Sequence, residues 1–142
     1  MISQTAEYAL RAIVMLADSD GAPQTTHRIA AATKVPADYL SKVLQSLGRA
    51  GIITSHRGMG GGSVLARPAS EISVYDVVQA VDPIARIQSC PLGLVNHGKL
   101  LCPLHRRIDN AIGSMESAFR STSIHELLAE PAESHPLCGV EV

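Results

Sequence analysis

The chain has 142 residues, of which 46% are hydrophobic and 3% aromatic, and it contains no tryptophan. This length suits one domain with appended elements but not two independent cores, and a core of Ala, Val, Ile and Leu favours helices. No apolar run is long enough to span a bilayer and the N-terminus lacks the pattern of a signal peptide, so we expect a cytoplasmic protein with no membrane partner.

The net charge of −1 hides a difference between the two halves of the chain. Residues 1–67 hold seven Lys and Arg against four Asp and Glu, a net charge of +3, whereas residues 68–142 hold five against nine, a net charge of −4. Proteins neutralise DNA phosphates with Lys and Arg, so the N-terminal half is where a nucleic-acid surface is expected.

Three amphipathic helices are predicted within the first fifty residues. Apolar residues at helical spacing predict the first over 5–17, and turn residues follow at 18–23. Thr25 and Thr26 can cap a second helix over 27–32, and Pro36 opens a third that Gly51 ends. The last two helices have the pattern of a helix-turn-helix motif, for which an ordinary helical hairpin is the alternative.

Two short strands over 52–55 and 63–66 are predicted directly after the third helix. They flank a turn with four glycines among residues 58–62. A hairpin in this place is typical of a wing, and Arg57 at its base is suited to a phosphate or to a narrow minor groove. A phosphate-binding loop of an enzyme is the weaker interpretation, because no Gly-Lys-Ser/Thr follows and the loop leads into a strand.

The C-terminal half is predicted to be helical. Ser73 and Ser123 each precede an acidic residue at capping-box spacing, which predicts helices from 74 to 81 and after 123. Between them, an apolar stripe from Leu104 to Phe119 predicts a helix of about five turns, which we expect to pack against a second copy.

The fold class expected from these elements is mainly α with a small β wing. We expect a winged helix-turn-helix DNA-binding domain over 1–82 and a cysteine-containing ligand or sensor loop over 83–103. A dimerisation helix with a short terminal helix over 104–129 and a flexible tail over 130–142 complete the expected organisation.

The opening TAEYALR at 5–11, the wing RGMGGG at 57–62 and the cysteine loop before a long helix together resemble the IscR/NsrR-type family of regulators. The resemblance covers nearly the whole chain, and the wing motif is specific. It implies a cytoplasmic homodimer that binds a palindromic double-stranded DNA operator and holds an iron-sulfur cluster whose state sets DNA affinity. It does not imply an enzyme, and no catalytic motif stands out.

The resemblance also indicates the DNA-contacting residues by position. It places Asp38, Tyr39 and Ser41 in the major groove, where Ser41 stands in place of a Glu found in some members, and Arg57 in the minor groove. The complete candidate set is Thr26, His27, Asp38, Tyr39, Ser41, Lys42, Arg57, Gly58, Gly60 and Gly61.

The family's ligand loop commonly has the spacing Cys-x5-Cys-x5-Cys, with a His three residues later in some members. Cys90 and Cys102 match the outer two cysteines and His105 matches the His, but Asn96 occupies the middle position. Because Asn is a poor ligand for iron, the usual three-cysteine site is not carried over. Cys138 has no counterpart in the loop and is interpreted as a thiol of the tail.

Two residues could complete the ligand set. His97 would give two Cys and two His, which suit a [2Fe-2S] cluster of mixed ligation or a tetrahedral zinc ion. Glu7 aligns with the acidic ligand that some relatives lend from the partner chain.

The favoured prediction is a repressor with a [2Fe-2S] cluster that senses redox state, iron or nitric oxide. Two alternatives stay open. One is a zinc-containing regulator, and the other is a cluster-free regulator in which Cys90 and Cys102 act as thiols or bind an effector. The basic residues that follow Cys102 would favour its reactive thiolate form.

Overall fold

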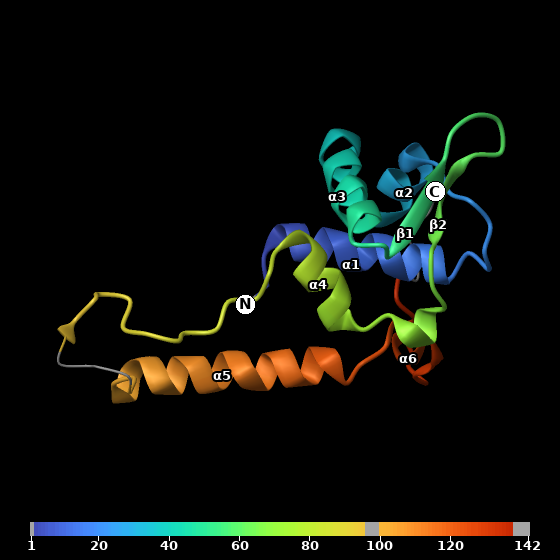
Figure 1. The fold of residues 1–142 in the computed structure, drawn as a ribbon. Coiled ribbons are helices and arrows are strands. Elements are labelled where there is room, and N and C mark those ends of the chain that lie inside the picture. Colours follow the sequence, from blue (N-terminus) through green and yellow to red (C-terminus); the bar gives the residue numbers. More distant parts are fainter. Residues whose placement is uncertain (1, 96–99, 138–142) are drawn as a thin grey trace.

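The computed structural model describes residues 2–95 and 100–137 and has the predicted fold class, mainly helical with a two-stranded antiparallel wing (Figure 1). Every helix and strand predicted from the sequence occurs within one or two residues of its expected bounds. In chain order the elements are α1 (Gln4–Ala17), α2 (Thr26–Thr33), α3 (Ala37–Arg49), β1 (Ile53–His56), β2 (Gly62–Leu65), the 3-10 turn η1 (Ala69–Glu71), α4 (Val74–Val81), α5 (Pro103–Arg120) and α6 (Ile124–Ala129). Among the described residues, no helix combines the length and the apolar character needed to cross a membrane.

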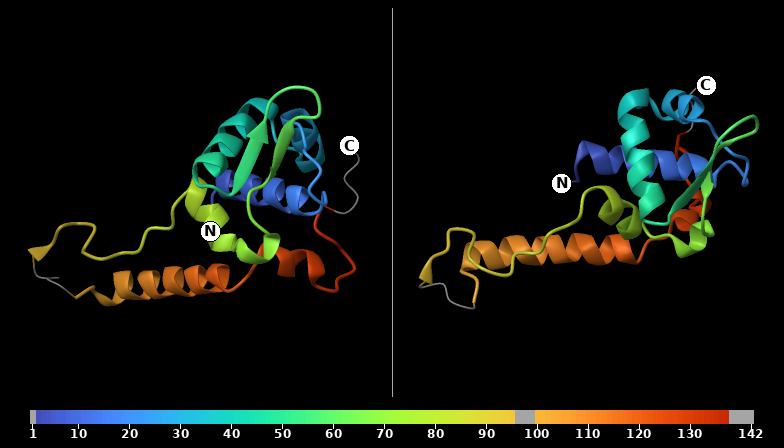
Figure 2. Two further views of the ribbon diagram at one scale, coloured as in Figure 1. Left: turned by 45° about the vertical axis from the view of Figure 1, so that its right-hand side comes forward. Right: turned by 45° about the horizontal axis from the view of Figure 1, so that its top comes forward.

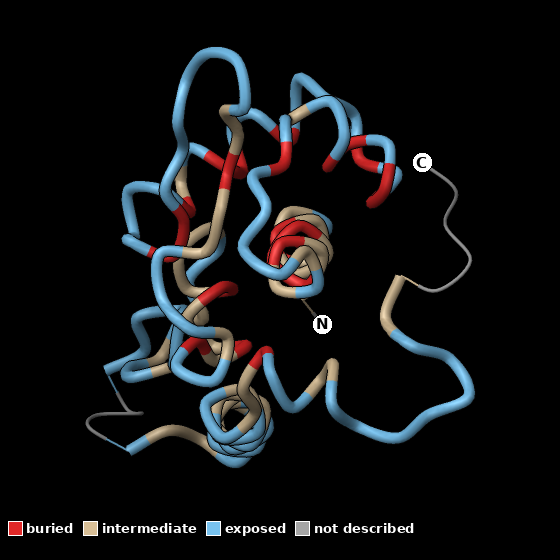
Figure 3. The backbone as a smooth tube through the Cα atoms, turned by 90° about the vertical axis from the view of Figure 1, so that its right-hand side faces the viewer, coloured by how far each residue is buried: buried red, intermediate tan, exposed pale blue. Residues whose placement is uncertain are grey.

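Helix α1 is the centre of the domain. It contacts α2, α3, α4, α6 and β2, and Figure 3 shows it nearly end-on, with its buried residues in red and the other elements around it. Three fully buried alanines, Ala6, Ala9 and Ala12, keep its surface small, so that neighbouring helices can approach closely. The largest side chains that fill the surrounding core are Ile13, Ile29, Leu40, Leu47, Ile52, Ile53, Ile72 and Ile124.

Two capping boxes predicted from the sequence are present and lie side by side. Ser73 caps α4 with Asp76, and Ser123 caps α6 with Glu126. The two helix starts are joined by an isolated antiparallel bridge between Ser73 and Ser123, within which the Val74 N–H donates to the Thr122 carbonyl at 2.9 Å. This bridge fixes the C-terminal end of α5, which leads directly into α6, on the domain.

The other end of α5 projects away from the domain. Figures 1 and 2 show α5 extending past the N-terminal domain, with the loop that precedes it running alongside. None of the 18 residues of α5 is buried, although the helix has a clear apolar stripe. Leu104 is 63% exposed and Ile108 is 42% exposed, so the projecting end of the stripe is uncovered by the described part of the chain, whereas Phe119 at the other end packs against the core.

Candidate functional site

The recognition helix of the helix-turn-helix motif is α3. Its apolar face, with Leu40, Val43, Leu44 and Leu47, is buried against the core, so the polar residues face outward. The turn before it is set by Lys34, which caps the end of α2 in the left-handed conformation at φ 56°. These contacts therefore hold α3 in a fixed position, with its polar face on the surface of the domain.

The wing is attached to the start of the helix-turn-helix motif by backbone hydrogen bonds. Ser63 on β2 exchanges two of them with Gln24, with N···O distances of 2.8 and 3.1 Å, while its hydroxyl lies 3.0 Å from that of Ser55 on β1. Gly62 makes this contact possible, because it adopts φ +141° and a Cβ there would lie 2.5 Å from the Gln24 carbonyl oxygen. The wing therefore has a fixed position relative to α2.

The glycines at 61 and 62 serve the packing of the wing itself. A Cβ at Gly61 would collide with the carbonyl oxygen of His56, so the hairpin could not close in its present form. The sequence interpretation gave the glycines the role of allowing close approach to another surface. The structure shows that Gly61 also allows the hairpin to close against its own backbone, and that Gly62 allows β2 to lie against the backbone of Gln24.

A groove of about 610 Å³ lies between α3 and the wing. One wall carries Ser41 and Gln45 of α3, and the other carries Ser55 and His56 of β1 and the adjacent Arg57. Hydroxyl, amide, imidazole and guanidinium groups are the side chains that proteins use to contact phosphate and sugar of a DNA backbone. The groove has the chemistry of a nucleic-acid interface.

The predicted DNA-contacting residues are distributed around this groove. Thr26, Ser41 and Arg57 line it. Asp38, Lys42 and His27 are exposed outside its lining, and Gly58, Gly60 and Gly61 belong to the connection between the wing strands.

Tyr39 is tied to α1 as well as exposed toward solvent. Its hydroxyl forms a hydrogen bond with that of Thr5, and its ring meets the ring of Tyr8 edge to face at 5.5 Å between centroids. Tyr39 therefore orients the recognition helix on α1, in addition to any contact with DNA.

Gln45, Ser55 and His56 are groove residues that the sequence interpretation missed. Gln45 follows Ser41 by one turn of α3, so helical spacing could have found it. Ser55 and His56 belong to β1, whose last three residues are exposed, and their proximity to α3 depends on how the wing folds back.

The cysteine loop brings two of its predicted ligands together. Cys102 is the residue before the first turn of α5, and its Sγ lies 3.3 Å from Nδ1 of His105, three residues later. Cys90 lies in a separate turn, in which the Gly93 N–H donates to the Cys90 carbonyl at 3.0 Å. Both thiols are half-buried.

The described part of the chain does not assemble a complete metal site. Within residues 2–95 and 100–137 no three His, Cys, Asp or Glu side chains come together as a ligand group. Asn96, His97 and Cys138 lie outside the described residues. The donor chemistry of Cys90, Cys102 and His105, two thiolates and an imidazole, nevertheless fits an iron-sulfur cluster or zinc.

Glu7 lies on α1, where its carboxylate pairs with Arg11 at 3.0 Å, four residues along the helix. Arg11 also donates to the Thr33 carbonyl at 3.2 Å, which ties this pair to the end of α2. A neighbouring cavity of about 290 Å³ includes Glu7, Arg11, Pro136 and Leu137 among its lining residues. Among the described residues, the lining of this cavity includes none from the cysteine loop.

Residues 2–130 match the model of the family described as "Rrf2: Iron-dependent Transcriptional regulator". Rv1287 of Mycobacterium tuberculosis, named as an HTH-type transcriptional regulator, is 42% identical over 94 residues, which are 65% of this chain and 58% of Rv1287. The matched region therefore spans less than two thirds of that relative.

Two solved structures share the fold. One is CymR, the global cysteine regulator of B. subtilis, with a TM-score of 0.72, 24% identity and coverage of 93% of this chain and 98% of CymR. The other is IscR of T. potens, with a TM-score of 0.73, 22% identity and coverage of 94% and 93%. The resemblance inferred from the motifs is confirmed, and the chain belongs to the Rrf2 family of winged-helix transcriptional regulators, which are not enzymes.

Proposed function

We propose that this protein is a homodimeric transcriptional repressor that binds a palindromic DNA operator and whose affinity for that operator depends on an iron-sulfur cluster held by the loop before α5. The observation that carries the DNA-binding part is the groove of about 610 Å³ between α3 and the wing. A strand of the DNA backbone would run through this groove, with α3 in the major groove and the wing beside the minor groove.

Arg57 has the central role on the wing side of the groove. The guanidinium is exposed at the end of β1, where it can reach a phosphate or enter a narrow minor groove. On the opposite wall, Ser41 and Gln45 can contact either the backbone or base edges. These two walls explain how one module would combine sequence-independent affinity with base recognition.

The apolar stripe of α5 supports the homodimer. An amphipathic helix gains stability by burying its apolar face, but Leu104 and Ile108 at the projecting end stay largely exposed. Pairing with a second copy through α5 would bury them and would relate two α3 helices by a two-fold axis. Such a dimer matches an operator with inverted half-sites about 34 Å, or one helical turn, apart.

The cluster would be held by Cys90, Cys102 and His105, with His97 or Glu7 from a second copy as the remaining ligand. When bound, a [2Fe-2S] cluster supplies a redox-active centre that also reacts with small oxidants and nitric oxide. In this chain, Cys102 and His105 at the start of α5 would place that centre next to the dimerisation helix. A change in the loop would therefore alter the relative position of the two subunits.

A thiol-responsive regulator is the second candidate, and the contact between Cys102 Sγ and His105 Nδ1 at 3.3 Å favours it. The contact places an imidazole directly beside the thiol that an oxidant or effector would modify. CymR, named as a cysteine regulator, and IscR share the fold of this chain, so the fold itself does not decide between the two candidates. Zinc at the same ligands is the third candidate.

The experiment is a selection of bound duplexes from a random-sequence library, with anaerobically purified protein, followed by affinity measurement on the selected site with loaded and metal-free protein. We expect an inverted repeat and an affinity change of about 5–150-fold between the two forms, as for a typical allosteric effector. Absence of an enriched site would contradict DNA binding. Equal affinity of the two forms would contradict the sensor role and leave the thiol candidate to be tested with oxidised protein.

A further inference from the structure

The loop between α4 and α5 is attached to α5 at one described place that the proposed function does not use. Figures 1 and 2 show residues 82–95 leaving α4 and running alongside α5. Near its start the loop is held by the Ile84 N–H, which donates to the Gln79 side-chain oxygen at 3.1 Å. The next anchor, Arg86 with Ile87, reaches across to Asp109 in the middle of α5.

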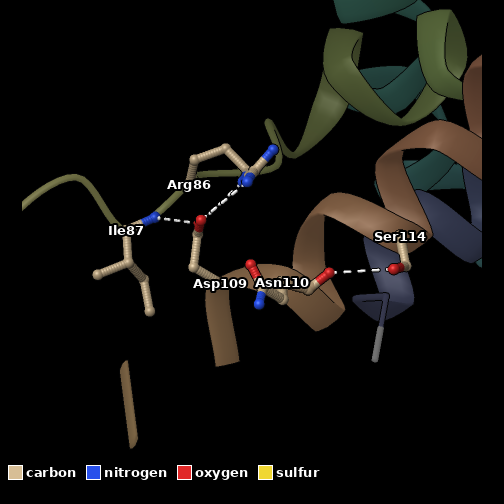
Figure 4. A network of polar contacts seen from close by, with 5 residues as sticks. All are labelled: Arg86, Ile87, Asp109, Asn110 and Ser114. Carbon is tan, nitrogen blue, oxygen red and sulfur yellow. Dashed lines mark hydrogen bonds and ion pairs between the residues drawn. The ribbon is translucent and has the colours of Figure 1, made fainter. Parts of the chain in front are cut away.

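Asp109 accepts three hydrogen bonds from the loop. Figure 4 shows Arg86 and the Ile87 nitrogen approaching its carboxylate. Arg86 donates through Nε to Oδ1 and through Nη2 to Oδ2, both at 2.8 Å, which is the two-pronged arrangement of a guanidinium on a carboxylate. The backbone N–H of Ile87 adds a third bond to Oδ1 at 2.9 Å. The planar guanidinium of Arg86 meets the carboxylate in one orientation, and the Ile87 N–H approaches the carboxylate from a second direction. Together these bonds fix the position of the loop on α5 and not only its distance from the helix.

Gly113 completes the arrangement one turn further along α5. A Cβ at this position would lie 3.0 Å from Cζ, Nη1 and Nη2 of Arg86, so the missing side chain leaves room for the guanidinium. Glycine in the interior of a helix weakens the helix, and its presence here therefore has a packing reason. We call Arg86, Asp109 and Gly113 together the loop anchor.

The loop anchor sets which loop residues face the start of α5. Asp109 lies one helical turn after His105 on the same face of α5. Cys102 precedes Asp109 by seven residues, which corresponds to about 10 Å along the helix axis. On the loop, Cys90 follows Ile87 by three residues, a reach of up to roughly 11 Å in an extended chain. An anchor at Ile87 and Asp109 therefore allows Cys90 to reach the Cys102 and His105 pair.

We propose that the loop anchor is a positioning device that holds Cys90 in register with Cys102 and His105, so that the two halves of the ligand set meet. The inference rests on the proposed function for its purpose, but the test below needs no bound metal. The side chains of Arg86 and Asp109 are 42% and 15% exposed, and solvent-accessible ion pairs of this kind contribute little to global stability. The anchor therefore controls the register of the loop, that is, which loop residues lie opposite which residues of α5.

The test measures how readily Cys90 and Cys102 are bridged by the bifunctional thiol reagent dibromobimane in full-length, metal-free protein. The background variant Cys138→Ser leaves only these two thiols, and the product that runs as a monomer under denaturing conditions reports bridging within one chain. The rate of single-thiol labelling by monobromobimane corrects for reactivity. We expect Arg86→Ala and Asp109→Asn to lower the corrected bridging rate by roughly tenfold, because alignment of the two thiols is lost.

Three further variants separate register from folding. Gly113→Ala introduces the Cβ beneath the guanidinium and should lower bridging although alanine favours the helix. Arg86→Lys keeps the charge but not the fork and should give an intermediate rate. Ser114→Ala is the matched control on α5, because that exposed hydroxyl donates to the Asn110 carbonyl of the same helix at 3.1 Å, and its bridging rate should stay at that of the background protein.

Unchanged bridging in Arg86→Ala and Asp109→Asn would overturn the loop anchor, and so would an equal loss in Ser114→Ala. The result is independent of the sensor proposal. A protein that binds no metal and still loses bridging in the anchor variants would refute the cluster but keep the anchor. A protein that assembles a cluster and bridges equally in all variants would refute the anchor but keep the cluster.

Discussion

The winged-helix region and the arm formed by the cysteine loop and α5 are built on different principles. The first packs around α1, and its core includes side chains that are completely buried, such as Ile13, Leu40 and Leu47. The second has an 18-residue helix without one buried residue, and its loop is held mainly by polar contacts. The winged-helix region carries a complete hydrophobic core, whereas the arm presents an apolar surface that one chain does not cover.

This difference separates the two tasks of a regulator. A rigid domain presents α3 and the wing in a constant geometry, which base recognition requires. The arm is stabilised by contacts that form only with a partner or a bound group, so its conformation can respond to both. The predictions below test the separation, from the largest expected effect to the smallest.

Truncation of a core residue should affect folding far more than truncation of an arm residue. Leu47 is completely buried, so Leu47→Ala should lower the free energy of unfolding by about 2–5 kcal/mol. Leu104 is 63% exposed, so Leu104→Ala should change the free energy of unfolding by less than about 0.5 kcal/mol at protein concentrations where dimers are absent. Urea denaturation followed by circular dichroism measures both, and comparable losses would show that the arm is part of the folding core.

A charge on the apolar stripe of α5 should weaken dimerisation without unfolding the monomer. Ile108→Asp places a carboxylate in the surface that we expect a second copy to bury, and should raise the dimer dissociation constant at least about tenfold, or 1.4 kcal/mol. Asn110→Asp adds the same charge at an exposed position on another face of the helix and is the control. If sedimentation equilibrium gives the same constant for both variants, α5 does not form the interface.

Removal of the wing arginine should change how DNA affinity depends on salt. Arg57→Ala should weaken operator binding and, if the guanidinium neutralises a phosphate, lower the slope of log affinity against log salt by about one. Arg67 lies beyond β2 and outside the groove, so Arg67→Ala should keep the wild-type slope. Fluorescence anisotropy at several salt concentrations gives the slopes, and equal slopes for the two variants would remove Arg57 from the interface.

The smallest effect is expected from titration of the arm. The hydrogen bonds from Arg86 and from the Ile87 N–H lower the pKa of Asp109 from its ordinary 3.8 to about 2. A lowered folded-state pKa means that the contribution of Asp109 to stability is fully present above pH 4 and is lost as the pH falls toward 2. Carboxyl-carbon NMR should show this midpoint, and Arg86→Ala should return it toward 3.8; a wild-type midpoint near 3.8 would show that the pair does not persist in solution.

Local signals in the sequence predicted most of the fold. Apolar residues at helical spacing located the long helices, and the Ser-x-x-Asp and Ser-x-x-Glu boxes at 73 and 123 gave the starts of the short helices α4 and α6 correctly. The glycines at 58–62 identified the wing, because the hairpin requires a residue without a Cβ at 61 and its contact with Gln24 requires one at 62. These features depend on residues that lie close together in the chain.

Contacts between distant residues could not be predicted in the same way. The hydrogen bond of Tyr39 to Thr5 joins residues 34 positions apart, and Arg86 meets Asp109 across 23 positions. His56 lines the groove only because the wing returns toward α3. Each of these contacts depends on how whole helices and strands pack together, and this packing cannot be predicted from a local sequence pattern.

The most direct test of the account is the iron, sulfide and zinc content of anaerobically purified protein, measured together with its visible absorbance, in wild type and in Cys102→Ser. The account predicts iron with matching sulfide and a visible band typical of thiolate-ligated clusters in the wild type, and loss of both in the variant. Wild-type protein that contains neither iron nor sulfide and still binds its operator with full affinity would contradict the central claim that a cluster in the loop before α5 controls DNA binding.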